Sequence, residues 1–222
     1  MRWLYFHGLG SGPHSSKARA LRAAFADEGV ELLAPDLRLP SSAGLRTSAM
    51  LALGQTLVRP DTVLLGASLG GLLALHVAAR VRPRALVLFA PALDLPDHRV
   101  SRPVLSTTWR WLGHFPVPDK GARGLTLVDA GFLADVEAFA ACPEPTVPTL
   151  VFHGRQDRLV NVAVSRRFAA QHRDVRLIEV DDGHDLLVEM PTIVVEIRRF
   201  LQREACVGPA QPGSPGTGDR AR

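Results

Sequence analysis

Short apolar runs and longer helical patterns alternate along most of the chain. Six runs have the length and the composition of buried strands: residues 3–6, 30–33, 62–65, 85–89, 149–152 and 175–180. Between them, apolar residues recur at helical spacing at about residues 16–28, 44–58, 69–80, 162–172 and 187–203. This alternation predicts an α/β fold: a doubly wound, mostly parallel sheet with right-handed connections and with helices on both faces.

One interval interrupts the rhythm. More than fifty residues separate Pro91 from Pro148, whereas connections in such folds usually take about 2–6 residues. The interval has a helical pattern over 129–140 and is rich in large apolar residues, namely Trp109, Trp111, Leu112, Phe115 and Phe132. We predict that residues 92–147 form a small lid-like insertion over the carboxyl edge of the sheet. An ordinary surface helix between long loops is the alternative.

The remaining sequence predicts one domain and a tail. A chain of 222 residues is long enough for a single α/β domain with a substantial core, and we place that domain at residues 1–205. From Gly208 the sequence is rich in Gly, Pro and Ser and has no apolar periodicity. Residues 206–222 are therefore predicted to be a disordered C-terminal tail.

Charge and cysteine content narrow the classes of partner. The net charge is +4, and Lys17 and Lys120 are the only lysines, so arginine supplies nearly all of the positive charge. The arginines are scattered, whereas a nucleic-acid surface needs a clustered stripe. Cys142 and Cys206 fit neither a metal site nor a disulfide framework, which favours free thiols in a reducing compartment.

Targeting signals are not visible in the sequence. The first apolar run is too short for a signal peptide, and no stretch approaches the ~18 apolar residues of a membrane span. We expect a cytoplasmic protein that acts on a small molecule, without membrane or nucleic-acid partners. The sequence leaves the oligomeric state open.

A serine stands on a glycine-rich turn between a predicted strand and a predicted helix. The segment Gly66-Ala67-Ser68-Leu69-Gly70-Gly71 follows the run 62–65 and opens the helical pattern 69–80. Such a nucleophile elbow lifts the serine hydroxyl clear of the sheet and directs the next N–H, here that of Leu69, toward a developing oxyanion. The alternative is a turn for packing or phosphate binding, but the Lys-Ser/Thr pair of a phosphate loop is missing.

A serine hydroxyl needs a base, and His184 is the best placed of the eight histidines. It follows the strand 175–180 at the carboxyl edge of the sheet, where active sites of this class lie. Gly183 before it permits an unusual backbone angle. The alternative is a solvent-exposed loop histidine.

Asp157, in the loop after the strand 149–152, is the candidate carboxylate that orients the base. Asn161 is the better cap for the following helix, which leaves Asp157 available. The order Ser68, Asp157, His184 is the one expected of the elbow fold. Three aspartates beside the histidine are rivals, ranked lower because adjacent residues rarely direct side chains at each other's ring: Asp181, Asp182 and Asp185.

The loop after the first strand supplies a second oxyanion donor, the N–H of Leu9. His7 and His153 are interpreted as structural and His76 as packed on its helix. No histidine pair has metal-binding spacing with a matched acidic ligand. Proton transfer and two N–H donors suffice for acyl transfer, so we expect neither a metal nor another cofactor.

These segments together resemble the α/β-hydrolase superfamily, from Trp3 to about Leu201. Within it, HGLGSGPHSSK at residues 7–17 resembles the opening of the YqiA-like esterases, small cytoplasmic enzymes with the pattern H-G-[FL]-x-S-x-P-x-S-x-K and a G-S-S-L-G-G elbow. Ala67 replaces a serine of that elbow. The long interval between Pro91 and Pro148 also departs from the family, which leaves the substrate open.

The resemblance implies carboxylic-ester hydrolysis by Ser68, Asp157 and His184, with Ser16 and Lys17 supporting the oxyanion loop. The sequence therefore predicts a serine hydrolase that cleaves a small carboxylic ester through an acyl-enzyme. A thioesterase or an amidase would use the same residues. A hydrolase-fold protein that binds without turnover is the alternative from another class.

Overall fold

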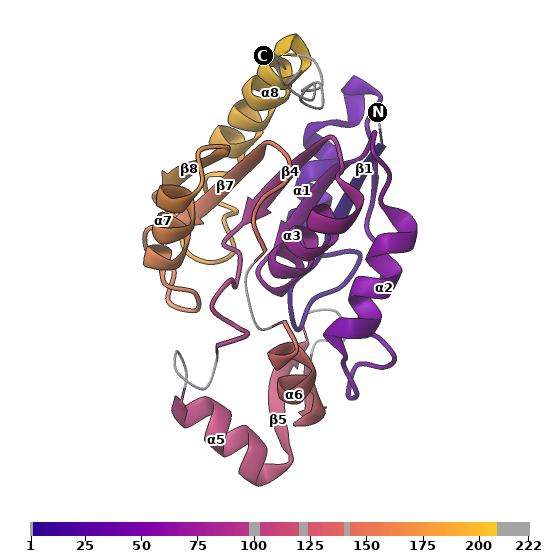
Figure 1. Ribbon diagram of the computed structural model, residues 1–222, viewed down its shortest axis with the longest axis vertical. Helices are drawn as coiled ribbons and strands as arrows, with labels where there is room; N and C mark the ends of the chain where they lie inside the picture. Colours follow the sequence, from indigo (N-terminus) through magenta and orange to yellow (C-terminus); the bar gives the residue numbers. More distant parts are fainter. Residues whose placement is uncertain (1, 98–102, 120–123, 140–142, 208–222) are drawn as a thin grey trace, which may run out of the picture.

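The computed structural model describes residues 2–97, 103–119, 124–139 and 143–207. Its centre is a six-stranded parallel sheet of order β2-β1-β3-β4-β7-β8 (Figure 1). The strands are β1 (Arg2–Phe6), β2 (Glu31–Leu33), β3 (Val63–Ala67), β4 (Ala85–Phe89), β7 (Thr149–Gly154) and β8 (Val175–Val180). All six predicted strands are confirmed, with β3 and β7 each extended by two residues toward the carboxyl edge.

Helices cover both faces of the sheet, because alternate residues of each strand point to opposite sides. On one face, strand residues such as Leu64 and Val151 pack with α2 (Thr47–Leu57), α3 (Leu69–Val81) and α7 (Val162–Gln171). On the other face, neighbours such as Leu65 and Phe152 pack with α1 (Ser16–Ala24) and α8 (Met190–Val207). The doubly wound architecture is thus confirmed.

Two helical regions end differently from the prediction in ways that change the description of the chain. The helical pattern over 16–28 is divided into α1 and a short 3-10 helix, η1 (Ala26–Glu28), which ends at Gly29 with φ 65°. Helix α8 continues to Val207, two residues into the range predicted as tail, and the rest of that range lies outside the described residues.

The interval after β4 carries secondary structure of its own. It contains α5 (Pro103–Leu112), an antiparallel hairpin of β5 (His114–Asp119) and β6 (Gly124–Asp129), and α6 (Gly131–Glu137). Of these, only the helical pattern around α6 is predicted by the sequence. The insertion extends beyond the end of the sheet opposite to α8 (Figure 1).

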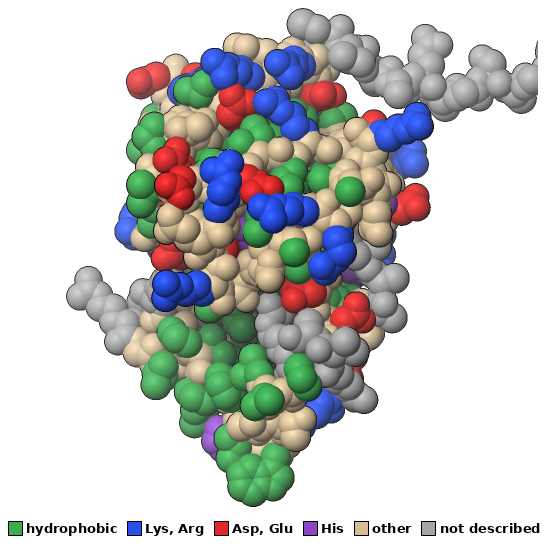
Figure 2. Space-filling model, turned by 90° about the vertical axis from the view of Figure 1, so that its left-hand side faces the viewer, with side chains coloured by type: hydrophobic (Ala, Val, Ile, Leu, Met, Phe, Trp, Pro, Cys, Tyr) green, Lys and Arg blue, Asp and Glu red, His purple; other side chains and the backbone are tan. Residues whose placement is uncertain are grey.

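Aromatic stacking holds the insertion together. Trp109 is buried, stacks on Phe115 and Phe132 at centroid distances of 5.3 and 5.6 Å, and donates a hydrogen bond from Nε1 to the carbonyl of Val128. Large apolar side chains nevertheless remain exposed on it, including Val104, Trp111, Leu125 and Leu127. Figure 2 shows hydrophobic side chains gathered at this end, whereas Lys and Arg side chains spread over the other end.

Candidate active site

Ser68 occupies the turn between β3 and α3 in a strained backbone conformation. Its φ of 53° and ψ of −118° lie in a region that costs a residue other than glycine about 1–3 kcal/mol. A side chain at Gly66 would overlap the carbonyl of Gly70, and one at Gly70 would overlap the carbonyl of Phe6. Both flanking glycines are therefore required by close backbone packing, and the turn is a nucleophile elbow in geometry.

Hydrogen bonds join the carboxyl ends of four strands around this serine. Ser68 N–H donates to the carbonyl of Phe89 at 3.0 Å, Ala90 N–H to Phe152 at 2.8 Å, and Arg155 N–H to Val180 at 2.9 Å. The loops after β3, β4, β7 and β8 therefore leave the sheet along one edge. Ser68, Asp157 and His184 all lie on these loops.

The structure brings Asp157 and His184 into direct contact. His184 Nδ1 lies 2.7 Å from Asp157 Oδ2. The Asp157 side chain is fully buried and that of His184 is 20% exposed. An ionised carboxylate only accepts hydrogen bonds, so Nδ1 carries the proton and Nε2 is left as the basic nitrogen. Within the described residues, no hydrogen bond joins His184 to the Ser68 hydroxyl; such bonds often tighten only when substrate binds.

Further donors fix the Asp157 carboxylate. Its Oδ1 accepts from the N–H groups of Leu159 and Val160 at 2.8 and 2.9 Å. Burial raises the pKa of this carboxyl, but the hydrogen bonds from His153, His184 and Val160 outweigh burial and hold the pKa below its usual value. Asp157 therefore stays ionised, as a partner for an imidazolium must.

His153 of β7 contacts the Asp157 carboxylate, and the sequence analysis did not predict this contact. It is fully buried, its Nε2 lies 2.9 Å from the carbonyl of Val160 and 3.3 Å from Asp157 Oδ2, and its Nδ1 lies 2.7 Å from Ser165 Oγ. A carbonyl only accepts, so Nε2 carries the proton and faces the carboxylate as a donor. No sequence pattern indicates this contact, because a spacing of four residues brings side chains together only in a helix, and His153 lies in β7.

Two of the three rival aspartates, Asp182 and Asp181, have structural contacts instead. Asp182 accepts from the N–H groups of Gly183, Val188 and Glu189, which shapes the His184 loop. Asp181 accepts from the side chain of Gln156. Asn161 caps α7 as predicted.

The expected role of Gly183 in this loop is wrong. The described positive-φ residues do not include Gly183, and the left-handed position of the loop is Leu186, with φ 53°. Leu186 is fully buried. Packing of its side chain in the core holds this conformation without glycine.

The loop after β1 runs against the elbow. A side chain at Gly8 would come within 3.3 Å of the Ala67 carbonyl and 3.8 Å of Ser68 Oγ. His7 Nδ1 lies 3.0 Å from the Gly8 carbonyl, and His7 Nε2 accepts from the N–H of Leu37 at 3.0 Å. In a trans peptide the C=O and N–H point in opposite directions, so the Leu9 N–H points away from His7.

Leu69 begins α3, where N–H groups have no partner within the helix. Neither Leu9 N–H nor Leu69 N–H donates to another described residue. Both are therefore available to an oxygen bound beside Ser68. The predicted structural role of His7 agrees with its two hydrogen bonds.

The two residues that the resemblance implies as supports differ in their contacts. Lys17 is buried, and its Nζ lies 5.4 Å from the ring centroid of Phe89 at the end of β4. The hydroxyl of Ser16 lies 3.4 Å from exposed Arg19. It is Ser15 that caps α1 and hydrogen-bonds to Tyr5.

Neither a metal cluster nor a membrane span is found in the described part of the chain. No three His, Cys, Asp or Glu residues there are grouped to hold a metal ion. No helix among those residues combines the length and the apolar character needed to cross a bilayer.

Solved structures share this architecture over nearly the whole chain. Alpha/beta hydrolase domain-containing protein 10 from mouse has a TM-score of 0.74 at 20% identity, over 91% of this chain and 90% of that chain. Est1E from Butyrivibrio proteoclasticus has a TM-score of 0.69 at 19% identity, over 92% and 88%. The chain has the α/β-hydrolase fold. A structure described for the metagenome-derived lipolytic enzymes LipS and LipT matches this hydrolase fold with a TM-score of 0.67 at 16% identity, over 91% and 93%.

Sequence comparison agrees with this α/β-hydrolase fold. Residues 2–108 match the model of an uncharacterised protein family, UPF0227. With the structural neighbours, this match confirms the resemblance to the YqiA-like α/β-hydrolases. The matched range covers the loop after β1 and the elbow. No curated protein sequence matches the chain.

Proposed function

We propose that this protein is a serine hydrolase that cleaves a small carboxylic ester with Ser68, His184 and Asp157. The observation that carries the proposal is the 2.7 Å contact between His184 Nδ1 and buried Asp157, on the same sheet edge as a serine with φ 53°. A strained serine and a carboxylate-oriented imidazole are the parts that acyl transfer requires. The lipolytic enzyme among the structural neighbours supports the same chemistry.

The reaction follows from the roles of these groups. Ser68 Oγ attacks the ester carbonyl while His184 Nε2 takes the hydroxyl proton, and the Leu9 and Leu69 N–H groups stabilise the resulting oxyanion. The C–O bond to the alcohol then breaks, and His184 returns its proton to the departing alkoxide. A water molecule, deprotonated by His184, releases the acid and regenerates Ser68. Asp157 stabilises the imidazolium in both halves.

A cavity of about 10 Å³, room for about one water molecule, lies beside the oxyanion loop where that loop meets the insertion. Its lining combines apolar side chains from that loop, from the segment before α2 and from the hairpin, together with a polar end: Leu9, Gly10, Arg38, Ser42, Leu45, Val117, Asp119, Thr126 and Val128. Because the hairpin packs against the loop that carries Leu9, the insertion is proposed to select the acyl chain. Hydrolysis rates of p-nitrophenyl esters should therefore depend on acyl length, and equal rates from acetate to octanoate would contradict this selection.

The direct test compares the wild type with Ser68→Ala in hydrolysis of p-nitrophenyl acetate. If the three residues act as a unit, kcat should fall by on the order of 10⁶, while the circular dichroism spectrum stays unchanged. A folded wild type that does not hydrolyse short oxygen esters would overturn ester hydrolysis. Measurable turnover of thioester or amide substrates in that case would retain the triad and change the substrate class.

A further inference from the structure

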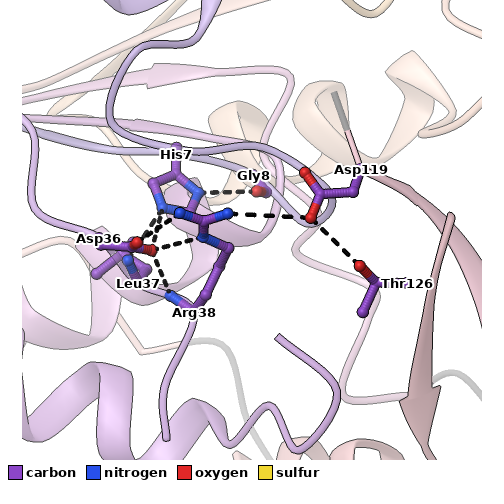
Figure 3. A network of polar contacts seen from close by, with 7 residues as sticks. All are labelled: His7, Gly8, Asp36, Leu37, Arg38, Asp119 and Thr126. Atoms are coloured by element: carbon purple, nitrogen blue, oxygen red, sulfur yellow. Dashed lines mark hydrogen bonds and ion pairs between the residues drawn. The ribbon is translucent and has the colours of Figure 1, made fainter. Parts of the chain in front are cut away.

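A chain of polar contacts runs from the oxyanion loop to the insertion (Figure 3). Its first link is His7, which is 3% exposed and bridges the Gly8 carbonyl and the Leu37 N–H. The backbone N–H of Leu37 only donates, so His7 Nε2 is the acceptor and Nδ1–H donates to Gly8. Burial lowers the pKa of His7 and maintains this neutral form. The direction of the Gly8 carbonyl, and with it the Leu9 N–H, thus depends on where Leu37 lies.

The residues on each side of Leu37 fix its position. Arg38 donates from Nε and Nη2 to the two carboxylate oxygens of Asp36, at 2.8 and 2.6 Å. Asp36 Oδ1 also lies 3.8 Å from His7 Nε2. The planar fork of an arginine matches a carboxylate in one orientation, so residues 36–38 are held as a rigid unit.

The hairpin of the insertion holds this unit in turn. Arg38 Nη1 lies 3.9 Å from Asp119 Oδ2 at the end of β5, and Asp119 is only 5% exposed. Thr126 on β6 donates to the same carboxylate oxygen at 3.2 Å. At Gly10, with φ 66°, a side chain would overlap the carbonyl of Pro118. The hairpin therefore touches the oxyanion loop directly and also reaches it through Arg38.

We infer that Arg38 and Asp119 are positioning residues through which the hairpin sets the direction of the Leu9 N–H in the oxyanion hole. The inference rests on the proposed function and deepens it. Neither residue touches the reacting atoms. The insertion would thus contribute to transition-state stabilisation as well as to the choice of acyl group, and moving the hairpin would change kcat.

The chain offers a matched control for a test of this inference. A second ion pair, Arg46 Nη1 to Asp129 Oδ1 at 3.0 Å, also joins the hairpin to the segment before α2. In the described part of the chain, the side chains of this pair make no hydrogen bond to His7 or to residues 36–38. Asp119→Asn and Asp129→Asn therefore make the same chemical change at opposite ends of one hairpin. p-Nitrophenyl acetate is the substrate, because its acyl group is too short to report on the choice of acyl chain.

Asp119→Asn should lower kcat about tenfold, a fraction of the 10²–10³ that loss of a whole oxyanion donor costs, with KM within about twofold of the wild type. Deuterium uptake at residues 7–12 should become faster. Asp129→Asn should change neither quantity. Arg38→Lys, which keeps the charge but loses the fork, should reproduce Asp119→Asn, and the double variant should be no worse than either single variant.

Equal effects of Asp119→Asn and Asp129→Asn would overturn the inference, because they would indicate general loosening of the insertion. An unchanged kcat and unchanged uptake in Asp119→Asn would also overturn it. If the wild type proves inactive, the proposed function fails, and deuterium uptake at residues 7–12 alone then decides whether Arg38 and Asp119 hold the loop.

Discussion

Asp157 illustrates how one residue organises the candidate site. Its two oxygens accept from His184, from two backbone N–H groups and, at a longer distance, from His153. The sequence predicted the contact with His184, because parallel strands place their following loops at one edge. It did not predict the support by His153, because a buried histidine at the end of a strand has many packing roles and periodicity does not distinguish them.

Asp157→Asn is expected to lower kcat by about 10⁴, because an amide cannot hold the His184 ring in the same tautomer. Steady-state hydrolysis of p-nitrophenyl acetate measures this loss. Asp181→Asn is the matched control, because Asp181 contacts only the Gln156 side chain among the hydrogen bonds described, and it should retain wild-type kcat. Comparable losses in the two variants would contradict the assignment of Asp157.

At the scale of elements, close backbone packing joins β1, β3 and α3 under the serine. Glycine patterns on either side of Ser68 were predictable, because a tight strand-to-helix turn requires them. The hairpin β5–β6 was not predicted. Pro116 and Pro118 lie within β5, and proline usually argues against a strand. Both are tolerated here because β5 pairs on one side only, with β6.

Gly70→Ala should destabilise the fold by about 3 kcal/mol or more, because the added methyl would overlap the Phe6 carbonyl and approach that of His7. Helix propensity alone predicts the opposite sign, a gain of about 1 kcal/mol. Gly183→Ala is the control, since nothing lies within 4 Å of the added atom. This variant should have the same urea midpoint of unfolding as the wild type. Urea denaturation measures the sign and the size of this change in stability. Equal midpoints for Gly70→Ala and the wild type would refute the close contact.

For the whole molecule, the pattern of apolar residues predicted the sheet, its faces and the edge that carries the site, because burial on both faces leaves a strong signal. It did not predict how the insertion joins the domain. That join includes Phe139, whose ring meets buried His76 of α3 edge-on at a centroid distance of 4.6 Å. His76 Nε2 has no hydrogen-bond partner in the described part of the chain.

Acid should therefore destabilise the protein partly through His76. Burial lowers the pKa of His76 from 6.5 to about 4, so between these values the unfolded chain binds more protons than the folded one. The free energy of unfolding then rises as pH increases from about 4 to 6.5, by on the order of 3 kcal/mol from this group, since each unit of pKa difference corresponds to about 1.4 kcal/mol. Burial also lowers the pKa of His7, so His7 makes the free energy of unfolding rise with pH in the same way.

Thermal unfolding of wild type and His76→Leu between pH 4 and 7 measures this contribution. The variant should lose less Tm on acidification than the wild type. Parallel Tm curves would show that His76 does not contribute. Hydrogen bonds from Arg38 hold the pKa of Asp36 at about 2. Asp36 does not affect this comparison, because its contribution to the free energy of unfolding is lost only as pH falls below about 4.

The measurement that tests the central claim most directly is labelling with a fluorophosphonate, followed by mass spectrometry of the modified peptide. The account predicts one phosphonyl group per chain, on Ser68, with labelling abolished in Ser68→Ala and strongly slowed in His184→Gln. A folded protein that remains unlabelled, or one labelled at another residue in both wild type and Ser68→Ala, would contradict the assignment of Ser68 as the nucleophile.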